Sequence, residues 1–112
     1  MAELKRYCLA LDLKNDPELI RQYEHLHREV WPDILQSIRE AGIEKLEIYR
    51  VENRLIMMME VNDRFSFERK KTMDDSNPRV QEWETLMWKF QKALPSAAPG
   101  EKWVLMDKIF QL

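Results

Sequence analysis

Cysteine and glycine are scarce in this chain, and hydrophobic residues never form a long uninterrupted run. The single cysteine, Cys8, cannot form an internal disulfide, and its apolar, strand-like surroundings predict an inert buried thiol. The two glycines, Gly42 and Gly100, form no glycine-rich loop after a strand, which excludes the nucleotide-binding fingerprints. No run is long enough to span a bilayer and the N-terminal residues carry no apolar signal region, so we expect a cytoplasmic protein without a membrane partner.

An excess of charge of either sign is also missing. The formal net charge is −2, from 18 basic and 20 acidic residues that are interspersed, and without a broad basic face nucleic acid is not an expected partner. The two histidines, His25 and His27, are two residues apart, and no second cluster has zinc-ligand spacing. We therefore expect neither a metal nor a cofactor. A length of 112 residues with 45% apolar side chains fits one globular domain over 1–112.

Hydrophobic periodicity predicts both strands and helices. Asp16-Pro17 and Asn77-Pro78 each combine a capping side chain with a proline at the first helical position, which marks the start of a helix. Glu52-Asn53 is a short turn between two strand-like runs and predicts an antiparallel hairpin. The predicted strands are 5–13, 43–51, 55–61 and 102–112, and the predicted helices are 17–30 or 31, 32–41, 65–73 and 78–94.

The predicted order βαββαβ is that of an α+β, ferredoxin-like fold, an antiparallel four-stranded sheet with helices on one face. The opposite face of such a sheet lacks a cover within the chain. The last predicted strand is also partly apolar on both of its faces, which is typical of a strand that a partner chain covers. We therefore expect a homodimer in which two sheets pack face to face, a dimeric α+β barrel.

Tyr23, His27 and Trp31 stand four residues apart, so on one continuous helix they would share a face. That face is apolar and should point inward, where polar groups need hydrogen-bond partners. Two interpretations follow. The imidazole could be a core histidine bonded to a backbone carbonyl, with the Tyr23 and Trp31 rings filling the core. Alternatively, the three side chains could line a cavity for a polar ligand.

Other residues strengthen the second interpretation. Trp83 by itself is most simply a core residue of the helix 78–94. Aromatic rings beside a histidine and a nearby acid, either Glu84 or Glu60, nevertheless resemble a sugar pocket, in which flat rings stack on the C–H face of a pyranose and polar groups bind its hydroxyls. Composition and periodicity thus favour a small ligand-binding domain or a cofactor-free enzyme, and go no further.

With these residues in view, the chain resembles the L-rhamnose mutarotase family over nearly its full length. The resemblance rests chiefly on the motif Tyr23-x3-His27-x3-Trp31-Pro32, which fixes four residues at set spacing. Supporting marks are Ile48-Tyr49, Trp83 and Lys108-Ile109-Phe110.

The resemblance implies a small dimeric α+β barrel that interconverts the anomers of a 6-deoxyhexose monosaccharide without metal or cofactor. It implies that His27 is the proton donor. It also implies a substrate-binding set of Tyr23, Trp31, Leu46, Tyr49, Trp83 and Glu84. The chain departs from the family pattern twice, with Leu46 in place of a tyrosine and Glu84 in place of the second of two tandem tryptophans. Both changes fall where the sugar should lie, so L-fucose is an expected substrate beside L-rhamnose.

Two other functions fit the same prediction of fold. The chain could be a different cofactor-free enzyme on a dimeric α+β barrel, such as a small monooxygenase or a haem-degrading protein. It could also be a non-catalytic module that binds a small ligand.

Overall fold

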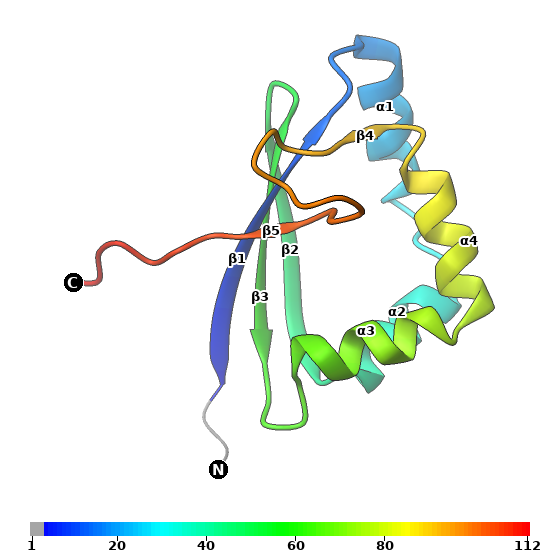
Figure 1. The fold of residues 1–112 in the computed structure, drawn as a ribbon. Helices are drawn as coiled ribbons and strands as arrows, with labels where there is room; N and C mark the ends of the chain where they lie inside the picture. The colour runs from blue at the N-terminus through cyan, green and yellow to red at the C-terminus, as the bar shows by residue number, and fades with distance from the viewer. Residues whose placement is uncertain (1–3) are drawn as a thin grey trace.

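A computed structural model describes residues 4–112. The chain forms an antiparallel sheet with four helices on one side of it, and its C-terminal segment leaves the domain on the other side (Figure 1). The elements in chain order are β1 (Lys5–Leu13), α1 (Pro17–Leu26), α2 (Pro32–Glu40), β2 (Ile43–Val51), β3 (Arg54–Val61), α3 (Phe67–Asp75), α4 (Pro78–Met87), β4 (Gln91–Lys92) and β5 (Val104–Leu105).

The sheet has the order β2-β3-β1-β4, and β5 also pairs with β1. All pairs are antiparallel, and β1 pairs with β3 from Lys5 opposite Val61 to Asp12 opposite Arg54. The α+β, ferredoxin-like prediction is therefore confirmed, with one difference. The fourth position of the sheet is shared by two short strands, because β4 pairs with one part of β1 and β5 with another.

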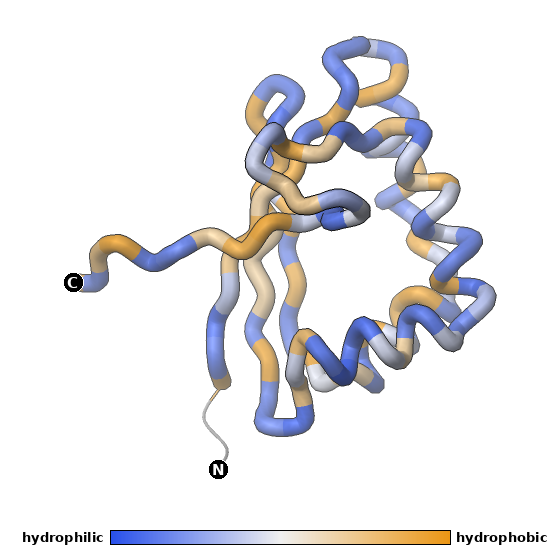
Figure 2. Tube along the Cα trace, viewed as in Figure 1, coloured by the Kyte–Doolittle hydropathy of each residue, from blue (hydrophilic) through white to orange (hydrophobic). Residues whose placement is uncertain are grey.

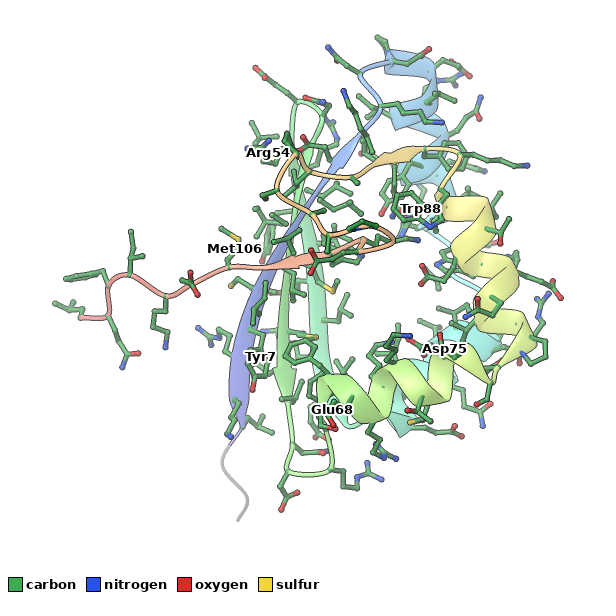
Figure 3. The ribbon with its side chains drawn as sticks, in the orientation of Figure 1. Tyr7, Arg54, Glu68, Asp75, Trp88 and Met106 are labelled. Carbon is green, nitrogen blue, oxygen red and sulfur yellow. The ribbon has the colours of Figure 1, made fainter. Side chains whose placement is uncertain are left out.

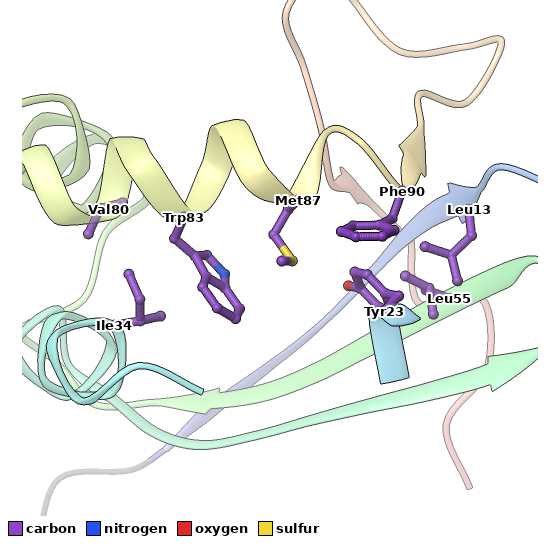
Figure 4. Close-up of a cluster of buried hydrophobic side chains, with 8 residues drawn as sticks. All are labelled: Leu13, Tyr23, Ile34, Leu55, Val80, Trp83, Met87 and Phe90. Atoms are coloured by element: carbon purple, nitrogen blue, oxygen red, sulfur yellow. The ribbon is translucent and has the colours of Figure 1, made fainter. Parts of the chain in front are cut away.

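Side chains that alternate along each strand divide the sheet into a covered and an open face. On the covered face, two hydrophobic clusters fill the space between sheet and helices. The larger one (Figure 4) contains Leu13, Tyr23, Ile34, Leu55, Val80, Trp83, Met87 and Phe90. The second contains Leu9, Ala41, Ile43, Met59 and Val61. Hydrophobic segments recur along the strands and again in the C-terminal segment (Figure 2).

Both predicted helix starts are present. The Asp16 carboxylate accepts hydrogen bonds from the backbone N–H groups of Glu18 at 2.9 Å and Leu19 at 3.3 Å, and Pro17 begins α1. Asn77 caps α4 in the same way, ahead of Pro78. Side-chain acceptors at these positions satisfy N–H groups that have no partner inside the helix.

Two predicted helix ends were wrong. Helix α1 ends at Leu26, and a tight turn leads to Trp31, whose extended backbone (ψ 134°) immediately precedes Pro32. Proline disfavours helical geometry in the residue before it, which accounts for the conformation of Trp31 and separates α1 from α2. Helix α4 ends at Met87 rather than at residue 94, because the following residues pair with the edge of β1 instead.

The predicted strand 102–112 was also too long. Only Val104–Leu105 are in a strand, opposite Leu9 and Ala10 of β1, and the Met106 N–H donates to the Cys8 carbonyl at 2.8 Å. Residues 106–112, here called the C-terminal arm, then extend away from the domain (Figure 1). A strand needs a neighbour for its backbone groups, and the arm leaves the edge of β1 after Met106.

Candidate active site

His27 is held by the last turn of α1. It is the C-terminal cap of that helix, and its ring Nδ1 lies 2.8 Å from the carbonyl oxygen of Tyr23. A carbonyl oxygen can only accept, so Nδ1 carries the hydrogen and the neutral ring presents a free lone pair at Nε2. The expected bond from a core histidine to a backbone carbonyl is therefore present. It also fixes the tautomer in which Nε2 can act as a base.

Burial controls the charge of this imidazole. The ring is half-buried, and its removal from water lowers the pKa of His27 below the usual 6.5, although the bond to the Tyr23 carbonyl opposes the change. The neutral form therefore predominates at neutral pH. The residue as a whole is half-buried, so the side chain is not fully enclosed.

Two of the three motif residues contact each other directly, and the third, Trp31, joins them through Trp83. The rings of Tyr23 and His27 have centroids 4.3 Å apart. The Trp83 ring on α4 approaches His27 at 5.6 Å and Trp31 at 5.0 Å, both edge to face. The Arg79 guanidinium lies 4.2 Å from the centre of the Trp31 ring, a cation–π contact that helps to hold it. Two segments of the chain thus assemble one aromatic wall beside the imidazole.

Tyr23 carries the most deeply buried polar group of this cluster. The residue is 3% exposed, and its hydroxyl oxygen accepts a hydrogen bond from the side-chain amide Nε2 of Gln91 at 3.3 Å. Burial raises the pKa of Tyr23 to about 12, the bond from Gln91 opposes this rise, and the negative charge of Glu84 adds to it. The phenol therefore keeps its proton and can serve as a hydrogen-bond donor.

Glu84 follows Trp83 on α4 and forms an ion pair with Lys102. The Lys102 ammonium also lies 4.7 Å from the centre of the Trp88 ring, where the loop after β4 passes the end of α4 (Figure 3). Burial lowers the pKa of Lys102, and the neighbouring Glu84 carboxylate opposes that change. The second position of the tandem tryptophans is thus occupied by a half-buried charge pair.

The remaining predicted site residues lie elsewhere. Leu46 is half-buried on the covered face of the sheet and packs against the second hydrophobic cluster. Tyr49 is 58% exposed on the open face, where its hydroxyl donates to Glu47 at 3.0 Å. Glu60 also points to the open face and pairs with Arg6 at 2.9 Å, so it lies on the opposite side of the sheet from the aromatic wall.

Sequence reasoning missed two polar residues of this region, Gln91 and Lys102. Gln91 was assigned to a helix that ends earlier, and Lys102 to the start of a strand, so neither was expected near Tyr23 or Glu84. No signal in the sequence brings these segments together, because the approach of β4 to β1 is a tertiary contact.

Surface hollows do not identify the site. A hollow of about 390 Å³ lies on the outer side of α1 and is lined by Asn15, Pro17, Ile20, Arg21, Glu24, Arg28, Arg50 and Glu52. It contains none of the predicted site residues. Within residues 4–112, no three histidine, cysteine or acidic side chains are grouped as a metal site requires. In the same range, no helix combines the length and the apolar character needed to cross a membrane.

A ferredoxin-like sheet with an aromatic wall beside a neutral histidine is typical of a small enzyme or ligand-binding domain. Comparison with known proteins identifies its family. A sequence model of L-rhamnose mutarotase matches residues 6–112. The chain is 50% identical over 111 residues to an L-fucose mutarotase of Xanthomonas campestris pv. campestris, covering 97% of this chain and 89% of that protein. A UPF0734 protein of Dictyostelium discoideum is 34% identical over 116 residues, with 98% and 91% covered.

A solved structure has the same fold. The crystal structure of an L-rhamnose mutarotase from Formosa agariphila superposes with a TM-score of 0.71 at 17% identity, covering 96% of this chain and 98% of that one. The chain belongs to the L-rhamnose mutarotase family. The predicted family and the predicted class of enzyme, a sugar mutarotase, are thereby confirmed.

Proposed function

We propose that the protein interconverts the α and β anomers of a 6-deoxyhexose, L-fucose before L-rhamnose, by general acid–base catalysis at His27. The observation that carries this proposal is the bond from Nδ1 to the Tyr23 carbonyl at 2.8 Å. It supports a neutral ring whose Nε2 has a free lone pair and can act as a base. Lowering of the His27 pKa by burial keeps that base unprotonated at neutral pH.

The reaction requires only proton transfers and one bond rotation. Nε2 takes the proton of the anomeric hydroxyl, its oxygen forms the aldehyde, and the bond from C1 to the ring oxygen breaks. The ring oxygen receives a proton from the resulting imidazolium, while the protonated Tyr23 hydroxyl donates a hydrogen bond to the sugar. Rotation about C1–C2 and the reverse steps close the other anomer. General acid–base assistance of this kind contributes about 10²–10⁴-fold.

Two features support L-fucose as the preferred sugar. L-fucose and L-rhamnose differ only in the configuration of ring hydroxyls, so polar contacts must distinguish them. Glu84 paired with Lys102 supplies charged groups at the position where the family pattern has a tryptophan. The relative with 50% identity is an L-fucose mutarotase. In this proposal Tyr23, Trp31 and Trp83 bound the sugar. Leu46 lies nearer the second hydrophobic cluster, and Tyr49 on the open face does not reach the sugar within one protomer.

We also propose that two copies form a homodimer through the open faces of their sheets. Tyr49 and Val51 are 58% and 66% exposed on this face. On the C-terminal arm, Ile109 is 95% and Phe110 is 76% exposed, and the arm extends on the side of the sheet away from the helices. Exposed apolar groups of this size favour burial against a second copy.

Saturation-transfer NMR measures the exchange between anomers directly and tests the proposed activity. We expect acceleration for L-fucose, a smaller effect for L-rhamnose, and at least a 10²-fold loss in His27→Ala. His25→Ala is a matched control, because His25 is exposed on the same helix. The proposal is wrong if the folded wild-type protein does not accelerate anomer exchange of any deoxyhexose. It is also wrong if His27→Ala keeps the wild-type rate.

A further inference from the structure

Gln91 is an unusual side chain for its surroundings. It is the first residue of β4 and pairs with Leu13, so its side chain lies on the covered face of the sheet beside Leu13 and Tyr23. The residue is 4% exposed. Its Nε2 donates to the Tyr23 hydroxyl at 3.3 Å, whereas its carbonyl oxygen Oε1 is fully buried and has no hydrogen-bond partner among residues 4–112.

An unpaired buried acceptor is costly. Leaving such a group without a donor destabilises a protein by about 1–3 kcal/mol, and an apolar side chain of the same size would avoid this loss. The neighbours of Gln91 in the larger cluster, Leu13 and Phe90, are apolar, so a methionine would suit this position better if packing alone decided it. The bond to the Tyr23 hydroxyl accounts for the amide nitrogen, whereas Oε1 is left for a donor that binds from outside the chain.

The Tyr23 hydroxyl, next to the Gln91 side chain, has an unused hydrogen-bond donor. The Tyr23 hydroxyl oxygen already accepts from Gln91, and within the part of the chain that is described its own proton is donated to no acceptor. An unused acceptor and an unused donor are thus held side by side. A hydroxyl group is both a donor and an acceptor. One sugar hydroxyl could donate to Gln91 and accept from Tyr23, which would satisfy both residues at once.

We propose that Gln91 is a sugar-binding, specificity-determining residue, whose Oε1 accepts a hydrogen bond from one ring hydroxyl of the deoxyhexose while Tyr23 donates to the same hydroxyl. This inference rests on the proposed mutarotase function. It adds a contact from β4 to the wall formed by α1 and α4. A site built to bond a hydroxyl rejects sugars that lack it or present it in another direction, because the buried amide is then left unpaired.

The test compares Gln91→Met with the wild-type protein by saturation-transfer NMR over a range of L-fucose concentrations. Loss of one neutral hydrogen bond should raise KM about tenfold and change kcat less. The melting temperature of the ligand-free protein should change little, since the variant removes the unpaired acceptor but also the donor to the buried Tyr23 hydroxyl. Gln36→Met is the matched control, because it makes the same chemical change on the exposed face of α2 and should alter neither value.

Analogues of L-fucose that each lack one ring hydroxyl identify the contact. For one analogue, the loss of affinity relative to L-fucose should be about tenfold smaller in Gln91→Met than in the wild-type protein, because only the Tyr23 bond to that hydroxyl remains to be lost. If the variant discriminates among all analogues as the wild type does, the inference is wrong. A lower melting temperature with unchanged KM would likewise show that Gln91 is only structural.

A measurement on the wild-type protein covers the case in which the variant does not fold. The NMR signals of the Gln91 side-chain amide should shift on saturation with L-fucose, and signals that do not move would overturn the inference. If the wild-type protein does not accelerate anomer exchange of any deoxyhexose, the proposed function and this inference are both refuted. Normal exchange with unchanged KM in Gln91→Met refutes the inference alone.

Discussion

Gly42, at the junction of α2 and β2, should be the least replaceable small residue of the fold. Its φ of +98° is in the left-handed region, and an added Cβ would lie 2.6 Å from Asn62 Oδ1 and 3.0 Å from the Phe65 backbone nitrogen. Asn62 cannot move freely, because its Oδ1 accepts from the Arg64 N–H at 2.9 Å and its own N–H donates to the Gly42 carbonyl at 2.9 Å.

Gly100 offers an internal control for the effect of Gly42→Ala. Its φ of +81° is also left-handed, but nothing lies within 4 Å of an added Cβ. In both variants the backbone strain costs about 1–2 kcal/mol. Only Gly42→Ala adds a steric clash and the loss of a hydrogen bond, worth about 1–2 kcal/mol more. That difference corresponds to roughly 5–10 °C in melting temperature for a chain of this size.

Thermal and urea unfolding of the two variants, monitored by circular dichroism, measures this difference. The reasoning also requires coupling to Asn62. In an Asn62→Ala background the closest contact is absent, so the gap between Gly42→Ala and Gly100→Ala should shrink. Equal destabilisation of the two single variants, or a gap that persists unchanged without the Asn62 amide, would refute the steric argument.

Three further predictions concern charge and assembly. Protonation blocks the His27 base, so kcat/KM for anomer exchange should be constant above pH 6.5. Below the lowered pKa of His27, kcat/KM should fall by up to about tenfold per pH unit. A rate that rises on acidification would contradict this prediction. Glu84→Gln leaves the half-buried Lys102 ammonium without its carboxylate partner, and should lower the free energy of unfolding in urea by about 1 kcal/mol. An unchanged urea midpoint would show that the pair is only a surface contact. Phe110→Asp should shift sedimentation velocity from dimer to monomer while Gln111→Asp, on the same arm, does not; a monomeric wild type would exclude the proposed dimer.

The linkage between pH and stability provides an independent check on His27. Its pKa in the folded protein is lower than in the unfolded chain, so the unfolded state binds a proton more readily between these two values. Stability should therefore fall as the pH drops from 6.5 towards the folded-state pKa, and this part of the loss should be absent in His27→Gln. Urea midpoints at pH 7.5 and 5.5 measure both proteins, and equal losses in the two would contradict the assigned pKa direction.

Much of the fold was predictable because local signals coincide. Asp16-Pro17 and Asn77-Pro78 start helices through their own side chains, and the alternation along 5–13 and 43–51 is independent of distant residues. Helix ends were less predictable. The segment after Met87 continues a helical pattern, yet it leaves the helix because β1 offers its backbone hydrogen-bond partners.

The candidate site was predictable only in part, for a related reason. The spacing of Tyr23, His27 and Trp31 predicted one shared helix face, but the helix ends before Trp31. The rings of Tyr23 and His27 contact each other, and the Trp31 ring joins them only through Trp83. The neighbours that determine hydrogen bonding, above all Gln91, come from segments that are close only after folding.

By itself, the sequence determined the order of the elements, the family and the residues of the aromatic wall, since each depends on spacing along the chain. The tertiary structure decided which nitrogen of His27 is free, that burial lowers its pKa, and which acceptor lies unpaired beside the Tyr23 hydroxyl. Those properties depend on burial and on contacts between distant segments, which no local pattern specifies.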